Sequence, residues 1–161
     1  MTHPIQSLIN RECRLLDQGQ LDDWLNLYDK DATYWIPIDE TSDPLKESSI
    51  IYDNRIRLEM RVEQIMRQDR VAQSPVSNTM RMVSNLEITE DGNEQAHAEF
   101  SLLVTEVRSG DWRQRGLGET RFFPGHCRMS FHLVEGAWKI KSKTLVLLNR
   151  KQPIVGLSFI L

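Results

Sequence analysis

The sequence predicts a cone-shaped α+β fold with three helices in the N-terminal half and a strongly curved mixed or antiparallel sheet, across whose concave side one amphipathic helix lies. Two observations support this. Before Ser74-Pro75 apolar residues recur mainly with helical spacing, whereas after it they alternate with polar residues as in β-strands. With 161 residues, of which 40% are hydrophobic, the chain is long enough to bury one core. We therefore expect one domain over residues 1–161.

Two helices are expected at the N-terminus. Pro4 suits the first turn of the first helix and Gly19 suits its end. Its expected buried face comprises Ile5, Leu8, Ile9, Glu12 or Cys13, Leu15 and Leu16. A second, short helix is predicted by large side chains at positions i, i+3, i+4 and i+7, namely Leu21, Trp24, Leu25 and Tyr28.

One early strand and a third helix follow. Ala32 to Ile38 is rich in β-branched and aromatic residues, with Pro37 at a sheet edge or at the strand's end. The polar stretch Asp39 to Ser49 is typical of an exposed loop. The third helix is expected to begin at a cap on Asp53 and to end near Gln68. Its apolar stripe consists of Leu58, Val62, Ile65 and Met66.

Four consecutive strands of an antiparallel meander complete the prediction, with turns at Glu90-Asp91-Gly92-Asn93 and Glu135-Gly136. Their inward faces are expected to carry Met80, Met82, Leu86 and Ile88; Ala96, Ala98, Phe100, Leu102 and Val104; Phe123, Cys127, Met129, Phe131 and Leu133; and Trp138, Ile140, Thr144, Val146 and Leu148. The cone interior is therefore predicted to be packed with apolar side chains, without a clear polar pair.

Charge, apolar segment length and cysteine content exclude several classes of function. A net charge of -3 from 23 acidic and 20 basic residues gives no field that attracts nucleic acid or anionic lipid. No segment approaches the roughly 18 apolar residues of a membrane-spanning helix, and no signal peptide pattern opens the chain. Cys13 and Cys127 lack CxxC partners and are expected to be buried thiols. We expect a cytoplasmic protein that binds neither nucleic acid nor membranes.

No metal or nucleophile site is predicted. A Rieske cluster needs Cys and His in paired short spacings, and no Cys-x-His occurs. His126 and His132 share a strand face, but six residues at about 3.3 Å each place them roughly 20 Å apart. His3 lies at the terminus, and a G-x-S-x-G turn is absent. We therefore expect no cofactor and no catalytic residue in this chain.

General acid/base chemistry inside the cone is the alternative. Enzymes with cone-shaped folds use a carboxylate, tyrosine or histidine with a shifted pKa. The candidates here are Tyr34, Tyr52, Asp53, His97, His126 and His132. A lone histidine on a strand is more often a surface or interface residue than a catalyst. We therefore favour the interpretation that the chain has no catalytic residue.

Arginines cluster from Arg55 to Arg81, and three interpretations compete. Arg55, Arg57, Arg61, Arg67, Arg70 and Arg81 could bind an anion, or form a solvated face with neighbouring acidic residues. Because Arg, Trp, Tyr and Met are favoured at protein interfaces, we favour a subunit contact. The interface candidates are Trp35, Pro37, Tyr52, Arg55, Arg57, Arg61, Arg81 and Trp112.

One run of sequence resembles a known family. Leu21-Asp22-Asp23-Trp24-Leu25-Asn26-Leu27-Tyr28, followed by Asp31-Ala32-Thr33-Tyr34-Trp35-Ile36-Pro37, is similar to the small (beta) subunit of aromatic-ring-hydroxylating dioxygenases, the Rieske non-haem iron oxygenases. Weaker matches are Tyr52–Arg55, Met80–Leu86 and Trp138–Lys141. The resemblance extends over nearly the whole chain.

The resemblance implies a fold and a set of partners. The fold is that of scytalone dehydratase and ketosteroid isomerase, also described as cystatin-like or nuclear transport factor 2-like. A large (alpha) subunit would carry the Rieske 2Fe-2S cluster and Fe(II), in a hexamer of three large and three small subunits with contacts among the small ones. Electrons would come from a reductase, directly or through a ferredoxin.

Two functions are therefore compared. The first is a non-catalytic structural subunit of a dioxygenase of aromatic compound catabolism, with Pro37 to Ile51 and Tyr52 to Arg61 as its candidate contact surfaces. The second is a stand-alone isomerase or dehydratase that uses a pocket acid/base on a small cyclic substrate.

Overall fold

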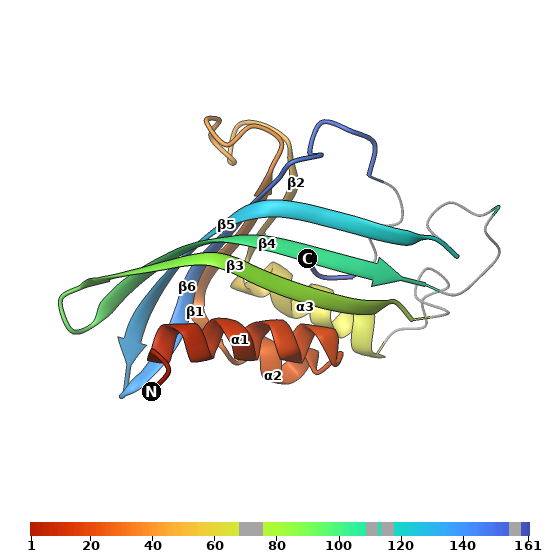
Figure 1. Cartoon of the computed structure of the whole chain (residues 1–161). Coiled ribbons are helices and arrows are strands. Elements are labelled where there is room, and N and C mark those ends of the chain that lie inside the picture. The colour runs from red at the N-terminus through yellow and green to blue at the C-terminus, as the bar shows by residue number, and fades with distance from the viewer. Residues whose placement is uncertain (68–75, 109–112, 114–117, 155–158) are drawn as a thin grey trace.

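A single mixed sheet organises the molecule. The computed structural model describes residues 1–67, 76–108, 113, 118–154 and 159–161. Six strands lie in the order β2-β1-β6-β5-β4-β3, and every neighbouring pair is antiparallel except β1 and β6, which are parallel. The sheet curves strongly, and the three helices lie along its concave side (Figure 1). The predicted cone-shaped α+β fold is confirmed.

The first helix begins and ends where the sequence predicts. In α1 (Pro4–Asp17), the Nδ1 atom of His3 accepts a hydrogen bond from the Ile5 amide at 3.2 Å. Gly19 has φ +69, and the amides of Gly19 and Gln20 donate to the carbonyls of Leu16 and Leu15 at 3.1 and 2.9 Å. This pair of bonds is a Schellman motif, which requires a left-handed residue and therefore favours glycine.

The second helix is shorter than predicted. α2 spans Leu21–Leu25, and Tyr28 is already the first residue of β1 (Tyr28–Pro37). The prediction that Tyr28 lies on the helical face is therefore wrong, although its side chain is buried. The strand also begins earlier than the predicted Ala32, because Tyr28 pairs with Ile140 of β6.

A short strand precedes the third helix where a loop and a helix cap were expected. β2 (Ser49–Asn54) pairs with β1 and forms the sheet edge. β1 is therefore an inner strand, and Pro37 is its last residue. α3 (Arg55–Arg67) is capped by Asn54, whose Oδ1 accepts from the Arg57 amide at 3.0 Å; the predicted cap on Asp53 is wrong. Leu58 and Val62 are buried in α3, whereas Met66 is exposed.

The meander is confirmed, with strands β3 (Asn78–Asp91), β4 (Gln95–Val107), β5 (Thr120–Val134) and β6 (Ala137–Leu147). Two β-bulges change which side chains face inward. Between Ser84 and Glu87, β3 has one more residue than β4, and Asn85 has φ 54 there. In β6, Lys141 is the extra residue, because Ile140 and Ser142 pair with consecutive residues of β5.

The bulges correct two predicted faces. Met80 and Met82 point outward and are exposed, while Arg81 between them points inward. In β6, the residues that follow the bulge and face the core are Lys143, Leu145 and Leu147, and Leu148 is exposed. The predicted inward faces of β4 and β5 are confirmed, apart from Leu133, which is only half-buried.

One core joins all the described elements. It packs the inner faces of the strands against α1, α2 and α3, and includes Ile160 and Leu161. Cys13 and Cys127 are buried in it and form no disulfide, as predicted. None of the helices within the described ranges is long and apolar enough to span a membrane.

Candidate functional site

A glutamate lies in the middle of the buried face of α1. Oε1 of Glu12 accepts hydrogen bonds from Trp24 Nε1 at 3.1 Å, from the Tyr28 hydroxyl at 3.1 Å and from Lys143 Nζ at 2.7 Å. The carboxylate and the ammonium are each 1% exposed. The interior therefore holds an ion pair, and the prediction of a purely apolar interior is wrong.

The β6 bulge explains how Lys143 reaches this position. Lys141 shifts the alternation by one residue, so Lys143 takes an inward position that a regular strand would give to Ser142 or Thr144. Nζ lies 5.6 Å from the centre of the Tyr34 ring, within the range of a cation–π contact.

Each partner keeps the other ionised. Burial alone raises the pKa of Glu12, but the charge and hydrogen bond of Lys143, with the hydrogen bond of Trp24, outweigh it and bring the pKa below its ordinary value. Burial alone lowers the pKa of Lys143, and the charge of Glu12 outweighs it and raises the pKa. The pair is thus a carboxylate and an ammonium at neutral pH.

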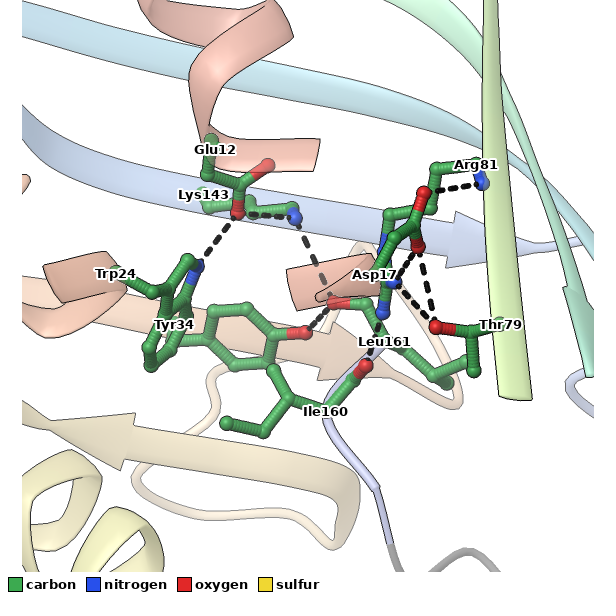
Figure 2. Close-up of polar contacts among 9 residues, drawn as sticks. All are labelled: Glu12, Asp17, Trp24, Tyr34, Thr79, Arg81, Lys143, Ile160 and Leu161. Atoms are coloured by element: carbon green, nitrogen blue, oxygen red, sulfur yellow. Dashed lines mark hydrogen bonds and ion pairs between the residues drawn. The ribbon is translucent and has the colours of Figure 1, made fainter. Parts of the chain in front are cut away.

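A second ion pair joins the end of α1 to β3 (Figure 2). Arg81 Nη1 contacts Asp17 Oδ1, and the Arg81 amide donates to Asp17 Oδ2 at 2.9 Å. The Thr79 hydroxyl donates to Asp17 Oδ1 at 3.1 Å. The Arg81 side chain is 1% exposed, so the expectation that it lies on an interface surface is wrong.

Both pairs surround the main chain of residues 160 and 161. The Tyr34 hydroxyl donates to the Leu161 oxygen, and Lys143 Nζ lies 3.5 Å from the same atom. Arg81 Nη2 donates to the Ile160 oxygen. Donors from β1, β3 and β6 therefore converge on two neighbouring main-chain oxygens (Figure 2).

This arrangement is poorly suited to acid/base catalysis. Efficient proton transfer needs a group whose pKa lies near the working pH. Glu12 and Lys143 are shifted away from neutrality, and burial raises the pKa of Tyr34 to about 12 against the opposing charge of Lys143. The interior network stabilises charge, and none of these three groups is poised to exchange a proton.

The remaining acid/base candidates do not gather around this network. Asp53 is buried and lies 2.7 Å from Arg61, and Tyr52 beside it is half-buried. His97 and His126 are exposed on the outer sheet face. Nε2 of His132 lies 3.3 Å from Asp29 Oδ2.

No metal-binding cluster is found within the part of the chain that the structure describes. There, no group of three or more His, Cys, Asp or Glu side chains lies together in a way that could hold a metal ion.

The other arginines among the interface candidates contact their own chain. Arg55 forms an ion pair with Glu59 at 2.9 Å and donates to the carbonyls of Leu25 and Tyr28 at 2.9 and 2.7 Å. Arg61 is paired with Asp53. Arg57 is exposed, and its Nη1 lies 3.3 Å from the Tyr52 carbonyl.

The remaining candidates differ in exposure. Trp35 is half-buried, and its Nε1 donates to the Ser49 hydroxyl at 2.9 Å. Pro37 is buried. Trp112 lies outside the described residues. Arg57 and the half-buried Tyr52 and Trp35 thus have side-chain surface for a partner, as do Arg55 and Arg61, whose side chains are 20% and 34% exposed.

The outer sheet face carries an apolar area that the sequence pattern does not predict. In one row, Met82 pairs with Leu103, which pairs with Pro124, and the Leu148 amide donates to the Pro124 carbonyl at 2.9 Å. In the next row, Met80 and Phe122 flank Thr105. We call Met80, Met82, Leu103, Phe122, Pro124 and Leu148 the outer apolar patch.

The patch is exposed, and further along the same face polar side chains such as Ser101, His126 and Arg128 border the sheet surface. Met82 is 55% exposed, Phe122 56% and Leu148 62%. Further along the face, near the β3 bulge, a groove of about 420 Å³ is lined by polar groups, including the Glu40–Arg128 ion pair at 3.1 Å. Contiguous exposed apolar surface rimmed by polar residues marks a binding surface.

Comparison with known proteins gives consistent matches. A family model described as ring hydroxylating beta subunit matches residues 11–152. The small subunit of 2-halobenzoate 1,2-dioxygenase from Burkholderia cepacia is 34% identical over 110 residues, which are 65% of this chain and 67% of that protein.

Solved structures match over almost the whole chain. The beta subunit of benzoate 1,2-dioxygenase from Burkholderia mallei has a TM-score of 0.75 at 27% identity, covering 97% of this chain and 99% of the other. An NTF2-like protein with a cystatin-like fold from Novosphingobium aromaticivorans has a TM-score of 0.64 at 16% identity, covering 91% and 80% of the two chains, and shows the fold alone.

Proposed function

Because the chain belongs to the ring-hydroxylating beta subunit family, we propose that it is the non-catalytic structural subunit of an aromatic-ring-hydroxylating dioxygenase. A large subunit would carry the Rieske 2Fe-2S cluster and Fe(II), and a reductase would supply electrons, directly or through a ferredoxin. We further propose a cytoplasmic assembly of three large and three small subunits. Relatives named as dioxygenases of 2-halobenzoate and benzoate support an aromatic acid as its substrate.

The observation that carries this proposal is the outer apolar patch. Its six side chains include no charge, and four of them, Met80, Met82, Phe122 and Leu148, are large and exposed. Leaving such a surface in water is unfavourable, and lasting subunit interfaces are more apolar than other protein surfaces. We propose that the large subunit covers this patch. Trp35, Tyr52 and Arg57 are proposed contacts between small subunits.

Co-expression with the large subunit tests the proposal. A neighbouring reading frame that encodes Cys-x-His and Cys-x-x-His pairs would supply this partner. A tag on the small subunit should retain the large one, and native mass spectrometry should give a three-plus-three complex. The variant Met82→Glu/Phe122→Glu should retain at least tenfold less large subunit, because two charges would have to be buried.

A methionine on α3 provides the matched control. Met66 is 45% exposed and lies outside both the patch and the candidate contact surface Tyr52 to Arg61, so Met66→Glu should retain the large subunit fully. Equal retention by the patch variant and the control would disprove this docking surface. If the wild-type chain retains no large subunit, the proposed subunit function itself is wrong.

A further inference from the structure

A positively charged groove lies beside the edge strand β2, next to the first turns of α3. We propose that it receives the acidic tip of the β3–β4 hairpin, residues 90–94, from a second copy of this chain. This inference rests on the proposed contact between small subunits, and it names the segment that makes that contact.

The groove offers hydrogen-bond donors and an excess of positive charge. Its volume is about 350 Å³, and its lining includes Pro44, Ser49, Tyr52, Asp53, Arg57 and Arg61. Asp53 is only 6% exposed and is neutralised by Arg61 at 2.7 Å. Two guanidinium groups and one carboxylate leave one positive charge in excess. We call this surface the arginine groove.

Arg57 supplies the unused charge of the arginine groove. It is exposed, and it forms no ion pair with any residue that the structure describes; its Nη1 lies 3.3 Å from the Tyr52 carbonyl. The Ser49 hydroxyl accepts from Trp35 Nε1 at 2.9 Å, which leaves its own proton for another acceptor. A guanidinium binds a carboxylate through two parallel hydrogen bonds, so an acidic side chain fits these donors.

The tip of the β3–β4 hairpin carries the opposite charge. Residues 90–94 include Glu90, Asp91 and Glu94 and no Lys or Arg, and all five residues are exposed. Glu90 lies 3.0 Å from His3, whereas Asp91 and Glu94 have no cationic partner in the described part of the chain. The tip projects past the helices, where another molecule can reach it (Figure 1).

The two surfaces lie at opposite edges of one sheet. β2, beside the arginine groove, is one edge strand, and β3, which leads to the tip, is the other. A contact between them therefore joins two copies head to tail. Head-to-tail contacts form closed rings when the rotation between copies is suitable, and a ring of three fits the proposed three small subunits.

The tip suits the arginine groove better than a free anion does. A single ion pair in an open groove contributes little, because water and salt screen it. The hairpin turn holds three carboxylates close together, so several contacts can form at once and little conformational entropy is lost on binding. The occupant is therefore a folded acidic segment, for which this chain itself provides an example.

Disulfide formation between copies tests the contact in the co-expressed complex. Pro44→Cys/Asn93→Cys places one thiol in the arginine groove and one on the tip, and changes no charge. Cys13 and Cys127 are only 7% and 1% exposed, so the new thiols are the accessible ones. Non-reducing electrophoresis should show small subunits linked to one another. The control Met66→Cys/Asn93→Cys should give roughly tenfold less product, because distant thiols cannot be bridged.

Charge reversal tests what holds the contact. In the Pro44→Cys/Asn93→Cys background, Arg57→Glu should slow linking roughly tenfold, because carboxylates would then face each other. Asp91→Lys/Glu94→Lys should slow it to a similar extent. Combining both reversals should restore the rate to within about threefold, because the attraction returns with its sign exchanged. Added salt should slow linking in the protein without charge reversals.

Two results would overturn the proposal. Linking no faster than in the Met66→Cys/Asn93→Cys control would show that the tip does not reach the arginine groove. Failure of the combined reversals to restore linking would show that the charges do not hold the contact.

Retention of the large subunit, measured on the same preparations, separates this contact from the proposed function. If the large subunit is retained but linking stays at the control level, the hairpin contact alone is wrong. If linking occurs without retention, the contact is supported and the proposed subunit function is wrong.

Discussion

Replacing Lys143 with methionine tests how strongly the interior depends on its charge balance. Methionine has a similar length and no charge, so Lys143→Met leaves the Glu12 carboxylate buried without its cation. The hydrogen bonds from Trp24 and Tyr28 to Glu12 remain, so the change isolates the ionic contact.

The expected effect follows from the geometry. Unit charges 2.7 Å apart attract by about 6 kcal/mol at an effective dielectric constant near 20. Removing both charges from water costs several kcal/mol per ion, which offsets much of this attraction. Breaking the pair by removing one partner should therefore lower the free energy of unfolding by about 3 to 5 kcal/mol.

Urea and thermal denaturation measure this loss. For a chain of this size the melting temperature should fall by about 6 to 20 °C. In the double variant Glu12→Gln/Lys143→Met, the Gln oxygen still accepts from Trp24 and Tyr28, so the free energy of unfolding should return to within about 2 kcal/mol of the wild type.

The pH dependence should differ between the two proteins. In the wild type the pKa of Glu12 is lowered, so its contribution to stability is present above the unfolded value of 4.5 and is lost as pH falls through the folded value. In Lys143→Met, burial without a cation should raise the pKa of Glu12. That variant should therefore gain stability from about pH 7 to about pH 5, by up to about 1.4 kcal/mol per pH unit.

Two outcomes would refute this reasoning. The double variant can be compared with the single variants Glu12→Gln and Lys143→Met. If its loss in free energy of unfolding equals the sum of the two single losses, the two charges do not depend on each other. If the Lys143→Met variant instead loses stability between pH 7 and pH 5, Glu12 is not buried as a lone charge in that variant.

Two further predictions concern the β3 bulge and the cysteines. Asn85 has φ 54, so Asn85→Val should lower the free energy of unfolding by about 1 to 2 kcal/mol, whereas Asn85→Gly should not lower it. Equal thermal stability of the two variants would contradict this. Burial raises the pKa of Cys13 and Cys127 to about 12, so the folded chain should not react with a disulfide reagent at pH 8, and both thiols should react after unfolding. Reaction of either cysteine in the folded chain would show that these sites open readily.

The sequence predicted elements well where the signals are local. Pro4 and Gly19 mark the ends of α1 through their own backbone preferences, and both positions are confirmed. The meander followed from alternation and Gly-containing turns. β2 was missed because it is a short edge strand that follows directly on the predicted loop, and Tyr28 continued a helical spacing by coincidence.

The interior was predicted less well because bulges change strand faces. A single extra residue moves every later side chain to the other face, and Lys141 carries no signal of its own. Glu12 could have been found, because a carboxylate on the buried face of a helix requires a partner. Its partner Lys143 could not, and the acceptors on residues 160 and 161 are main-chain atoms without a side-chain signature.

The parallel pairing of β1 with β6 has a consequence for how the chain folds. Tyr28 pairs with Ile140, and Trp35 with Thr144. The inner edge of the early strand β1 therefore stays unpaired until the last strand, β6, has formed. Closing such a long loop before contacts form makes folding slow and leaves strand edges open during synthesis. Glu12, made early, likewise lacks its counterion until Lys143 emerges. The nascent chain is therefore most prone to aggregation just before β6 is complete, when a chaperone would protect it most.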